Sequence, residues 1–131
     1  MTLEALKSLA VQMMERAYCP YSHFPVGVAL ECKDGTVFTG CNIENASYPV
    51  GSCAERTAIS KAISEGHRDF VRIVIAGKTE EPCVPCGMCR QLMKEFVPDL
   101  EVICLNVRGE AVSYQLSDLL PYGFDGSYLN H

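Results

Sequence analysis

The chain has 131 residues, of which 48% are hydrophobic and 21% charged, and its formal net charge is −5. This length fits one compact domain, so we expect residues 1–131 to form a single domain, since most domains contain roughly 100 to 150 residues. The 11 lysines and arginines are scattered among 16 acidic residues without a basic cluster, which excludes the usual footprint of a protein that binds a nucleic acid polymer.

No segment of the sequence predicts a membrane partner or secretion. Residues 1–7 begin an amphipathic pattern instead of the basic region and apolar run of a signal peptide. No stretch approaches the ~20 apolar residues that span a bilayer. We therefore expect a cytoplasmic protein, and because the cytosol keeps thiols reduced, its 8 cysteines favour metal binding or catalysis over disulfides.

The first predicted elements are a helix and a hairpin. Leucine and methionine recur at helical spacing and predict an amphipathic helix over residues 3–17. Two apolar runs, 26–30 and 36–40, flank a turn sequence that contains Asp34 and Gly35. This arrangement predicts a β-hairpin.

A second helix is predicted after a polar loop, over residues 52–64. Ser52 is the expected N-cap, and Glu55, three residues later, completes the pattern of a capping box. Gly66 is expected to stop this helix.

The second half of the chain alternates strands and helices. We predict a strand over 70–76, a helix over 86–96, a strand over 101–106, and a short strand with a helical turn over 112–120. This alternation predicts an α/β fold in which a sheet carries helices on both faces. In such folds ligands bind beyond the carboxyl ends of the strands, where loops lead into helices.

Three cysteines lie at the starts of two predicted helices. Cys86 and Cys89 are three residues apart, so both side chains can face one point, and Cys53 begins the earlier helix. Helix starts carry partial positive charge, which stabilises thiolates. Three protein ligands leave a tetrahedral zinc ion one open position for water, as in catalytic sites. The sequence therefore predicts one catalytic zinc per chain.

Glu55 and Arg56 are the residues expected to support this metal. Glu55 follows Cys53 by two residues, about 200° around an ideal helix, which makes it a poor co-ligand but allows a proton shuttle at the open position. Cysteine two residues before a glutamate, followed by Pro-Cys-x-x-Cys, is the described signature of zinc nucleobase deaminases. Arg56 is expected to hydrogen-bond to the ligand sulfurs and to reduce the excess negative charge of three thiolates.

The remaining cysteines leave one alternative open. Cys83, Cys86 and Cys89 form a tight run that could hold zinc, or act as a thiol-redox module, without any enzymatic activity. Since Cys83 precedes Pro85 in the loop, we interpret it as a spare thiol. Three others lie among strand-like residues and are expected to pack in the core as small hydrophobes: Cys32, Cys41 and Cys104.

Five separated segments carry a family resemblance. They are Tyr18-x-Pro20-Tyr21-Ser22-x-Phe24, Gly40-Cys41-Asn42-Ile43-Glu44-Asn45-Ala46, Cys53-Ala54-Glu55-Arg56 with Pro85-Cys86-Gly87-Met88-Cys89-Arg90-Gln91, and Leu119-Leu120-Pro121 with Phe124. With them the chain resembles the small, three-cysteine cytidine deaminases almost from end to end. The resemblance implies a three-layer α/β/α sandwich with a central mixed sheet of about five strands. Val84 and Met88 depart from the family pattern and affect only the expected shape of the base pocket.

The resemblance also implies the reaction. It is the zinc-dependent hydrolysis of cytidine and 2′-deoxycytidine to uridine and 2′-deoxyuridine, with release of ammonia, as in pyrimidine salvage. Zinc on Cys53, Cys86 and Cys89 activates the water that attacks C4, and Glu55 moves the protons.

The substrate contacts and the assembly are implied in the same way. Asn42 and Glu44 hold the ribose hydroxyls, Phe24 packs on the nucleoside, and Ala54 contacts the base through its backbone. The family's small members are homotetramers with shared active sites, and Phe124 is the aromatic residue expected from a neighbouring subunit. A sister deaminase for another aminopyrimidine, such as the antibiotic blasticidin, remains an alternative that Asn42, Glu44 and Phe24 argue against.

Overall fold

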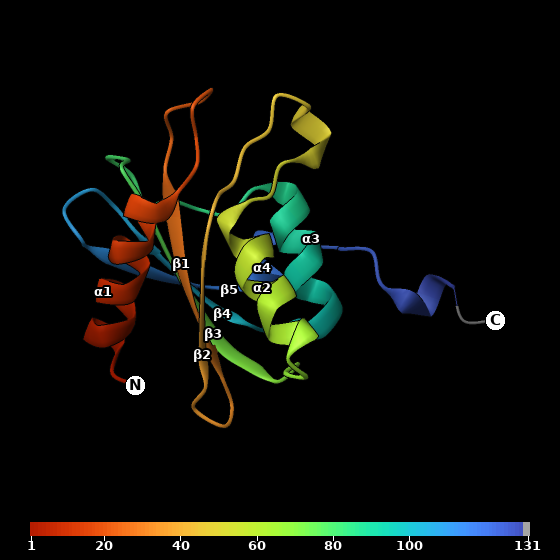
Figure 1. Cartoon of the computed structure of the whole chain (residues 1–131). Helices are drawn as coiled ribbons and strands as arrows, with labels where there is room; N and C mark the ends of the chain where they lie inside the picture. Colours follow the sequence, from red (N-terminus) through yellow and green to blue (C-terminus); the bar gives the residue numbers. More distant parts are fainter. Residues whose placement is uncertain (130–131) are drawn as a thin grey trace.

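A five-stranded mixed sheet forms the middle layer of the structure, a computed structural model that describes residues 1–129 (Figure 1). Its strands are β1 (Val26–Cys32), β2 (Val37–Cys41), β3 (Phe70–Gly77), β4 (Glu101–Leu105) and β5 (Ala111–Gln115). They lie in the order β2-β1-β3-β4-β5, with β3 and β4 parallel and every other neighbouring pair antiparallel. The predicted mixed sheet of about five strands is confirmed.

Helices cover both faces of this sheet. The helices are α1 (Leu3–Met13), α2 (Ala54–Ser64), α3 (Gly87–Phe96) and α4 (Leu116–Leu119), with short 3₁₀ turns η1 (Met14–Arg16), η2 (Tyr48–Val50) and η3 (Gly126–Tyr128). Helix α1 packs on one face, and α2 and α3 pack on the other (Figure 1). The predicted three-layer α/β/α sandwich is therefore confirmed. None of the helices within residues 1–129 is long and apolar enough to cross a bilayer.

The central strands are apolar on both sides because both faces of the sheet are covered. Successive side chains of a strand point to opposite faces. In β3, Ile73 and Ile75 join the larger core cluster beneath α2 and α3, whereas Val74 and Ala76 join the smaller cluster beneath α1. An unbroken hydrophobic run is the pattern expected of a strand buried on both faces.

The elements predicted from the sequence agree with the structure for the strands and differ from it at the ends of helices. The hairpin of β1 and β2 forms as predicted, with Gly35 at a φ of 92° in its turn. The predicted helix over 3–17 ends earlier as an α-helix, at Met13, and continues through one 3₁₀ turn to Arg16. The short strand and helical turn predicted near the end of the chain correspond to β5 and α4.

The predicted cap of the second helix is wrong. Cys53, not Ser52, is the N-cap of α2, and no side chain caps this end. Ser52 is held in an extended conformation by backbone pairing with Ile43, and its hydroxyl group lies 3.1 Å from the Thr57 hydroxyl group. This pairing delays the helix by two residues and places Cys53 at its start.

Gly40 sets the distance between β2 and α2. A Cβ atom at Gly40 would lie 2.4 Å from the Ala54 carbonyl oxygen and 2.7 Å from the Ala58 amide nitrogen, both backbone atoms of α2. We expect Gly40→Ala to lower the free energy of unfolding by about 3 kcal/mol or more, because backbone cannot relax as a flexible side chain can. Gly126→Ala is the control, because within residues 1–129 no atom outside Gly126 and its two chain neighbours lies within 4 Å of its Cβ position. Equal chemical denaturation curves for wild type and Gly40→Ala would contradict this prediction.

Candidate metal centre and active site

Two helix starts meet at one edge of the sheet. Strands β2 and β3 both pair antiparallel with β1, so they run in the same direction. The loops at their carboxyl ends lead into α2 and α3, whose N-caps are Cys53 and Cys86. The topology therefore brings together two cysteines that are 33 residues apart in the sequence.

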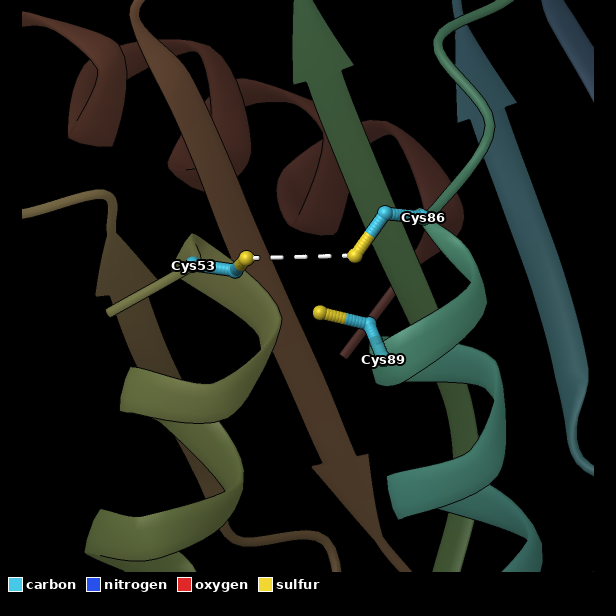
Figure 2. A group of neighbouring side chains, drawn as sticks. All are labelled: Cys53, Cys86 and Cys89. Atoms are coloured by element: carbon cyan, nitrogen blue, oxygen red, sulfur yellow. Dashed lines mark hydrogen bonds between the residues drawn. The ribbon is translucent and has the colours of Figure 1, made fainter. Parts of the chain in front are cut away.

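The sulfur atoms of Cys53, Cys86 and Cys89 converge. They point toward one another from the two helix starts (Figure 2) and all lie within 4.8 Å of one another. The Cys53 and Cys86 sulfurs are 3.9 Å apart. Tetrahedral zinc with Zn–S bonds of about 2.3 Å needs sulfurs about 3.8 Å apart. The three thiols therefore fit the zinc ion that the sequence predicts.

Negative charge in this cluster concentrates on Cys53. Hydrogen bonds from the Cys89 and Cys86 thiols, and the nearby positive charge of Arg56, lower the pKa of Cys53 to about 6. The same hydrogen bonding, together with burial, raises the pKa of Cys89. A thiolate at the N-terminus of α2 also benefits from the partial positive charge of the helix. The cluster is thus prepared to bind a cation.

Arg56 contributes charge but no hydrogen bond. Arg56 is half-buried, and within residues 1–129 no hydrogen bond joins its guanidinium group to a cysteine sulfur. The positive charge of Arg56 lowers the pKa of Cys53, whereas the predicted hydrogen bonds to sulfur are not formed in this structure.

Cys83 lies outside the cluster. Its side chain is buried, and its sulfur fills the space above Gly77, where a Cβ atom would approach it to 2.7 Å. Burial raises the pKa of Cys83 to about 11. Within the described part of the chain, the three thiols that lie close enough to hold one metal ion are those of Cys53, Cys86 and Cys89, without Cys83. This geometry agrees with a spare thiol and disfavours a local knot of Cys83, Cys86 and Cys89.

Glu55 is a buried carboxyl group beside the cluster. It lies in the first turn of α2 and is 5% exposed. Burial, with a smaller contribution from the negative charge of Cys53, raises the pKa of Glu55 to about 7. A group whose pKa lies near neutrality can both accept and donate a proton at that pH. The expected proton shuttle therefore has a suitable environment.

A cavity of about 520 Å³ opens next to the metal centre. Its size falls in the range of small-molecule sites. It is lined by Tyr21, Ser22, Asn42, Ile43, Glu44, Asn45, Tyr48, Gly51, Ser52, Cys53 and Met88. The structure thus places two of the predicted substrate contacts, Asn42 and Glu44, in one cavity with the predicted metal ligand Cys53.

Both of these polar side chains are already hydrogen-bonded to a neighbouring loop. The Asn42 amide accepts from the Val26 N–H group and donates to the Phe24 carbonyl oxygen, each at 2.8 Å. Glu44 accepts from the Tyr21 and Ser22 N–H groups, at 3.0 and 3.1 Å, and from the Ser22 hydroxyl group. The Ser22 hydroxyl group is the main cause of a Glu44 pKa below its usual range. The role of this loop was missed from the sequence, although Tyr21 and Ser22 lie within a family motif.

The other predicted contacts do not line the cavity. Ala54 is fully buried at the start of α2, and Phe24 is exposed on the loop before β1. Phe124 is also exposed and stacks on Tyr128, with ring centroids 5.0 Å apart. It lies on the C-terminal segment, which extends away from the three layers (Figure 1). The Phe124 ring is therefore outside the cavity of its own chain.

Comparisons with known proteins agree with this site. The model of the family described as "Cytidine and deoxycytidylate deaminase zinc-binding region" matches residues 1–105. The chain is 50% identical over 122 residues to a cytidine deaminase of Halalkalibacterium halodurans, covering 92% of each protein. It is 42% identical over 132 residues to a cytidine deaminase of Sporosarcina psychrophila, covering 100% of this chain and 97% of the relative. The crystal structure of cytidine deaminase from Burkholderia pseudomallei matches with a TM-score of 0.91 and 48% identity, over 95% of this chain and 100% of that one. The chain therefore belongs to the cytidine and deoxycytidylate deaminase family.

Proposed function

We propose that the protein hydrolyses cytidine and 2′-deoxycytidine to uridine and 2′-deoxyuridine with release of ammonia, a step of pyrimidine salvage. The observation that carries this proposal is the convergence of three thiols near the buried carboxyl group of Glu55, with one of them, Cys53, lining a cavity large enough for a nucleoside. Family membership supports the same reaction. The spacing and chemistry of the thiols favour a zinc enzyme over a binding module.

The metal site consists of Cys53, Cys86 and Cys89, and it takes one zinc ion per chain. When bound, zinc supplies a Lewis acid that acidifies a water molecule at neutral pH. Arg56 limits the negative charge of the three thiolates through its own positive charge.

Glu55 moves the protons of the reaction. As a carboxylate it takes a proton from the attacking water and delivers it to N3 of the cytosine ring, while the water oxygen bonds to C4. It next takes the remaining proton of that oxygen and passes it to the exocyclic amino group. The C4–N bond then breaks, ammonia leaves and the uracil ring remains.

Neighbouring residues hold the substrate in place. Glu44 and Asn42 face the sugar from the lining of the cavity. The family resemblance adds packing of Phe24 on the nucleoside and a contact of the Ala54 backbone with the base. A 5′-phosphate near the Glu44 carboxylate would be repelled in a poorly screened pocket, so nucleosides are favoured over nucleotides.

The proposal includes the oligomeric state of the protein and its location in the cell. The 131 residues act as one deaminase domain, and four copies form a homotetramer in which Phe124 reaches a neighbour's site. The exposure of Phe124 outside its own cavity supports this arrangement. A reducing, cytoplasmic setting is consistent with 8 cysteines that are all free.

Substrate turnover tests the function directly. We expect zinc-loaded protein to convert cytidine and 2′-deoxycytidine, with ammonia and the uracil nucleoside formed in equal amounts. Cytidine monophosphate should remain unchanged, because Glu44 repels phosphate, and adenosine should remain unchanged as a purine nucleoside outside the proposed substrate class. No conversion of any of the four compounds, at one zinc per chain, would contradict the proposed substrate class.

Removal of the Glu55 carboxylate tests the proton pathway. Glu55→Gln should retain zinc and lose about 10³-fold or more in kcat, because an amide cannot carry the protons. Glu65→Gln is a matched control, since Glu65 is an exposed glutamate at the far end of the same helix. Zinc content and single-turnover rates are the measurements. A zinc-loaded Glu55→Gln variant within tenfold of the wild-type rate would exclude this role.

Two cysteine variants test the ligand set. We expect Cys53→Ala to lose stoichiometric zinc at micromolar concentration, and Cys83→Ala to retain one zinc per chain. The reason is that Cys53 lies in the sulfur cluster and Cys83 does not. Metal analysis after gel filtration measures both. Full zinc in Cys53→Ala with loss in Cys83→Ala would instead support the local three-cysteine knot.

A further inference from the structure

Ser22 connects two of the proposed substrate contacts. Its hydroxyl group donates a hydrogen bond to Glu44 Oε2 and accepts one from the Phe24 N–H group at 3.1 Å. Its own N–H group donates to Glu44 Oε1 at 3.1 Å. Ser22 thus binds the Glu44 carboxylate through both its backbone and its side chain, and it lines the same cavity.

The acceptor sites of Glu44 are almost all filled by this loop. An ionised carboxylate offers about four lone-pair sites, two on each oxygen. Oε1 accepts from the Tyr21 and Ser22 N–H groups, and Oε2 accepts from the Ser22 hydroxyl group. One site on Oε2 is left for a further donor. The carboxylate therefore has a fixed orientation and the capacity for one more hydrogen bond.

The loop that supplies these donors is itself held by the segment that carries Glu44. The Tyr18 N–H group donates to the Asn42 carbonyl oxygen at 3.0 Å, and the Glu44 N–H group donates to the Tyr18 carbonyl oxygen at 2.8 Å. Within the loop, His23 adopts a φ of 55° and donates to the Cys19 carbonyl oxygen at 3.0 Å. The donors are thus in place before a ligand arrives, which lowers the entropy cost of ordering a long acidic side chain on binding.

We propose that Ser22 is a positioning residue that holds the Glu44 carboxylate so that its remaining acceptor site receives a 2′- or 3′-hydroxyl group of the nucleoside sugar. This inference rests on the proposed function and deepens it. Ser22 acts through Glu44, so its contribution depends on the presence of a sugar hydroxyl donor in the substrate. A residue that only maintained the loop would affect every nucleoside equally.

The test compares Ser22→Ala with wild type on cytidine and on 2′,3′-dideoxycytidine, which lacks both hydroxyl groups. With cytidine we expect kcat/KM to fall about tenfold, mainly through KM, because the carboxylate loses its fixed orientation. With dideoxycytidine the fall should be less than about twofold. Where turnover of the dideoxynucleoside is too slow, its competitive inhibition constant replaces KM. Ser22→Thr keeps the hydroxyl group and should recover most of the cytidine activity.

A matched control separates this effect from the general loss of a surface hydrogen bond. Ser113→Ala removes an exposed serine–glutamate hydrogen bond of the same kind, from Ser113 to Glu101 Oε2 at 2.8 Å, between β5 and β4. It should leave both kinetic constants unchanged. Zinc content and the unfolding midpoint of Ser22→Ala should equal those of wild type.

The outcomes distinguish the two proposals. Equal losses on cytidine and dideoxycytidine, or no loss on either, would overturn the role of Ser22 while wild-type turnover of cytidine still supports the deaminase. A zinc-loaded wild type that converts no cytidine would contradict both. A tenfold loss confined to cytidine, with recovery in Ser22→Thr, would establish the assignment.

Discussion

The site depends on one constraint: two helices must begin at the same edge of the sheet, close enough for their first residues to share a metal ion. The common direction of β2 and β3 brings the starts of α2 and α3 to that edge. Gly40 allows the α2 backbone to lie against β2. The result is a Cys53–Cys86 sulfur distance of 3.9 Å, which suits tetrahedral zinc. Backbone packing thus brings the two helix starts, and with them Cys53 and Cys86, to one place.

Two glutamates of the site show how environment separates chemical roles. Glu55 is buried beside a thiolate, so its charged form is disfavoured and its pKa rises to about 7. Glu44 accepts three hydrogen bonds from one loop, so its charged form is favoured and its pKa falls. The first environment suits proton transfer and the second suits a permanent acceptor. The same functional group is therefore suited to the proposed chemistry in one position and to the proposed recognition in the other.

The sequence predicted most elements and the cysteine cluster, and two of its errors have a common physical cause. The hairpin and the cysteines at helix starts follow from local patterns, which sequence periodicity and turn residues express directly. The cap at Ser52 was wrong because pairing with Ile43, nine residues earlier, holds Ser52 extended. The contact of Ser22 with Glu44 was missed because it joins residues 22 positions apart. Local patterns carry no information about such long-range pairing.

Exposed apolar side chains lie around the cavity. Tyr48, Val50 and Met88 are 77%, 62% and 56% exposed, near a cavity that is open to solvent. Apolar side chains gathered at the rim of a site are more typical of an interface than of a free surface. Phe124 lies exposed on a segment that extends from the three layers, held through its backbone by the Gln91 side chain. An apolar rim and an exposed aromatic residue support the proposed homotetramer, because a closed symmetric assembly would bury both.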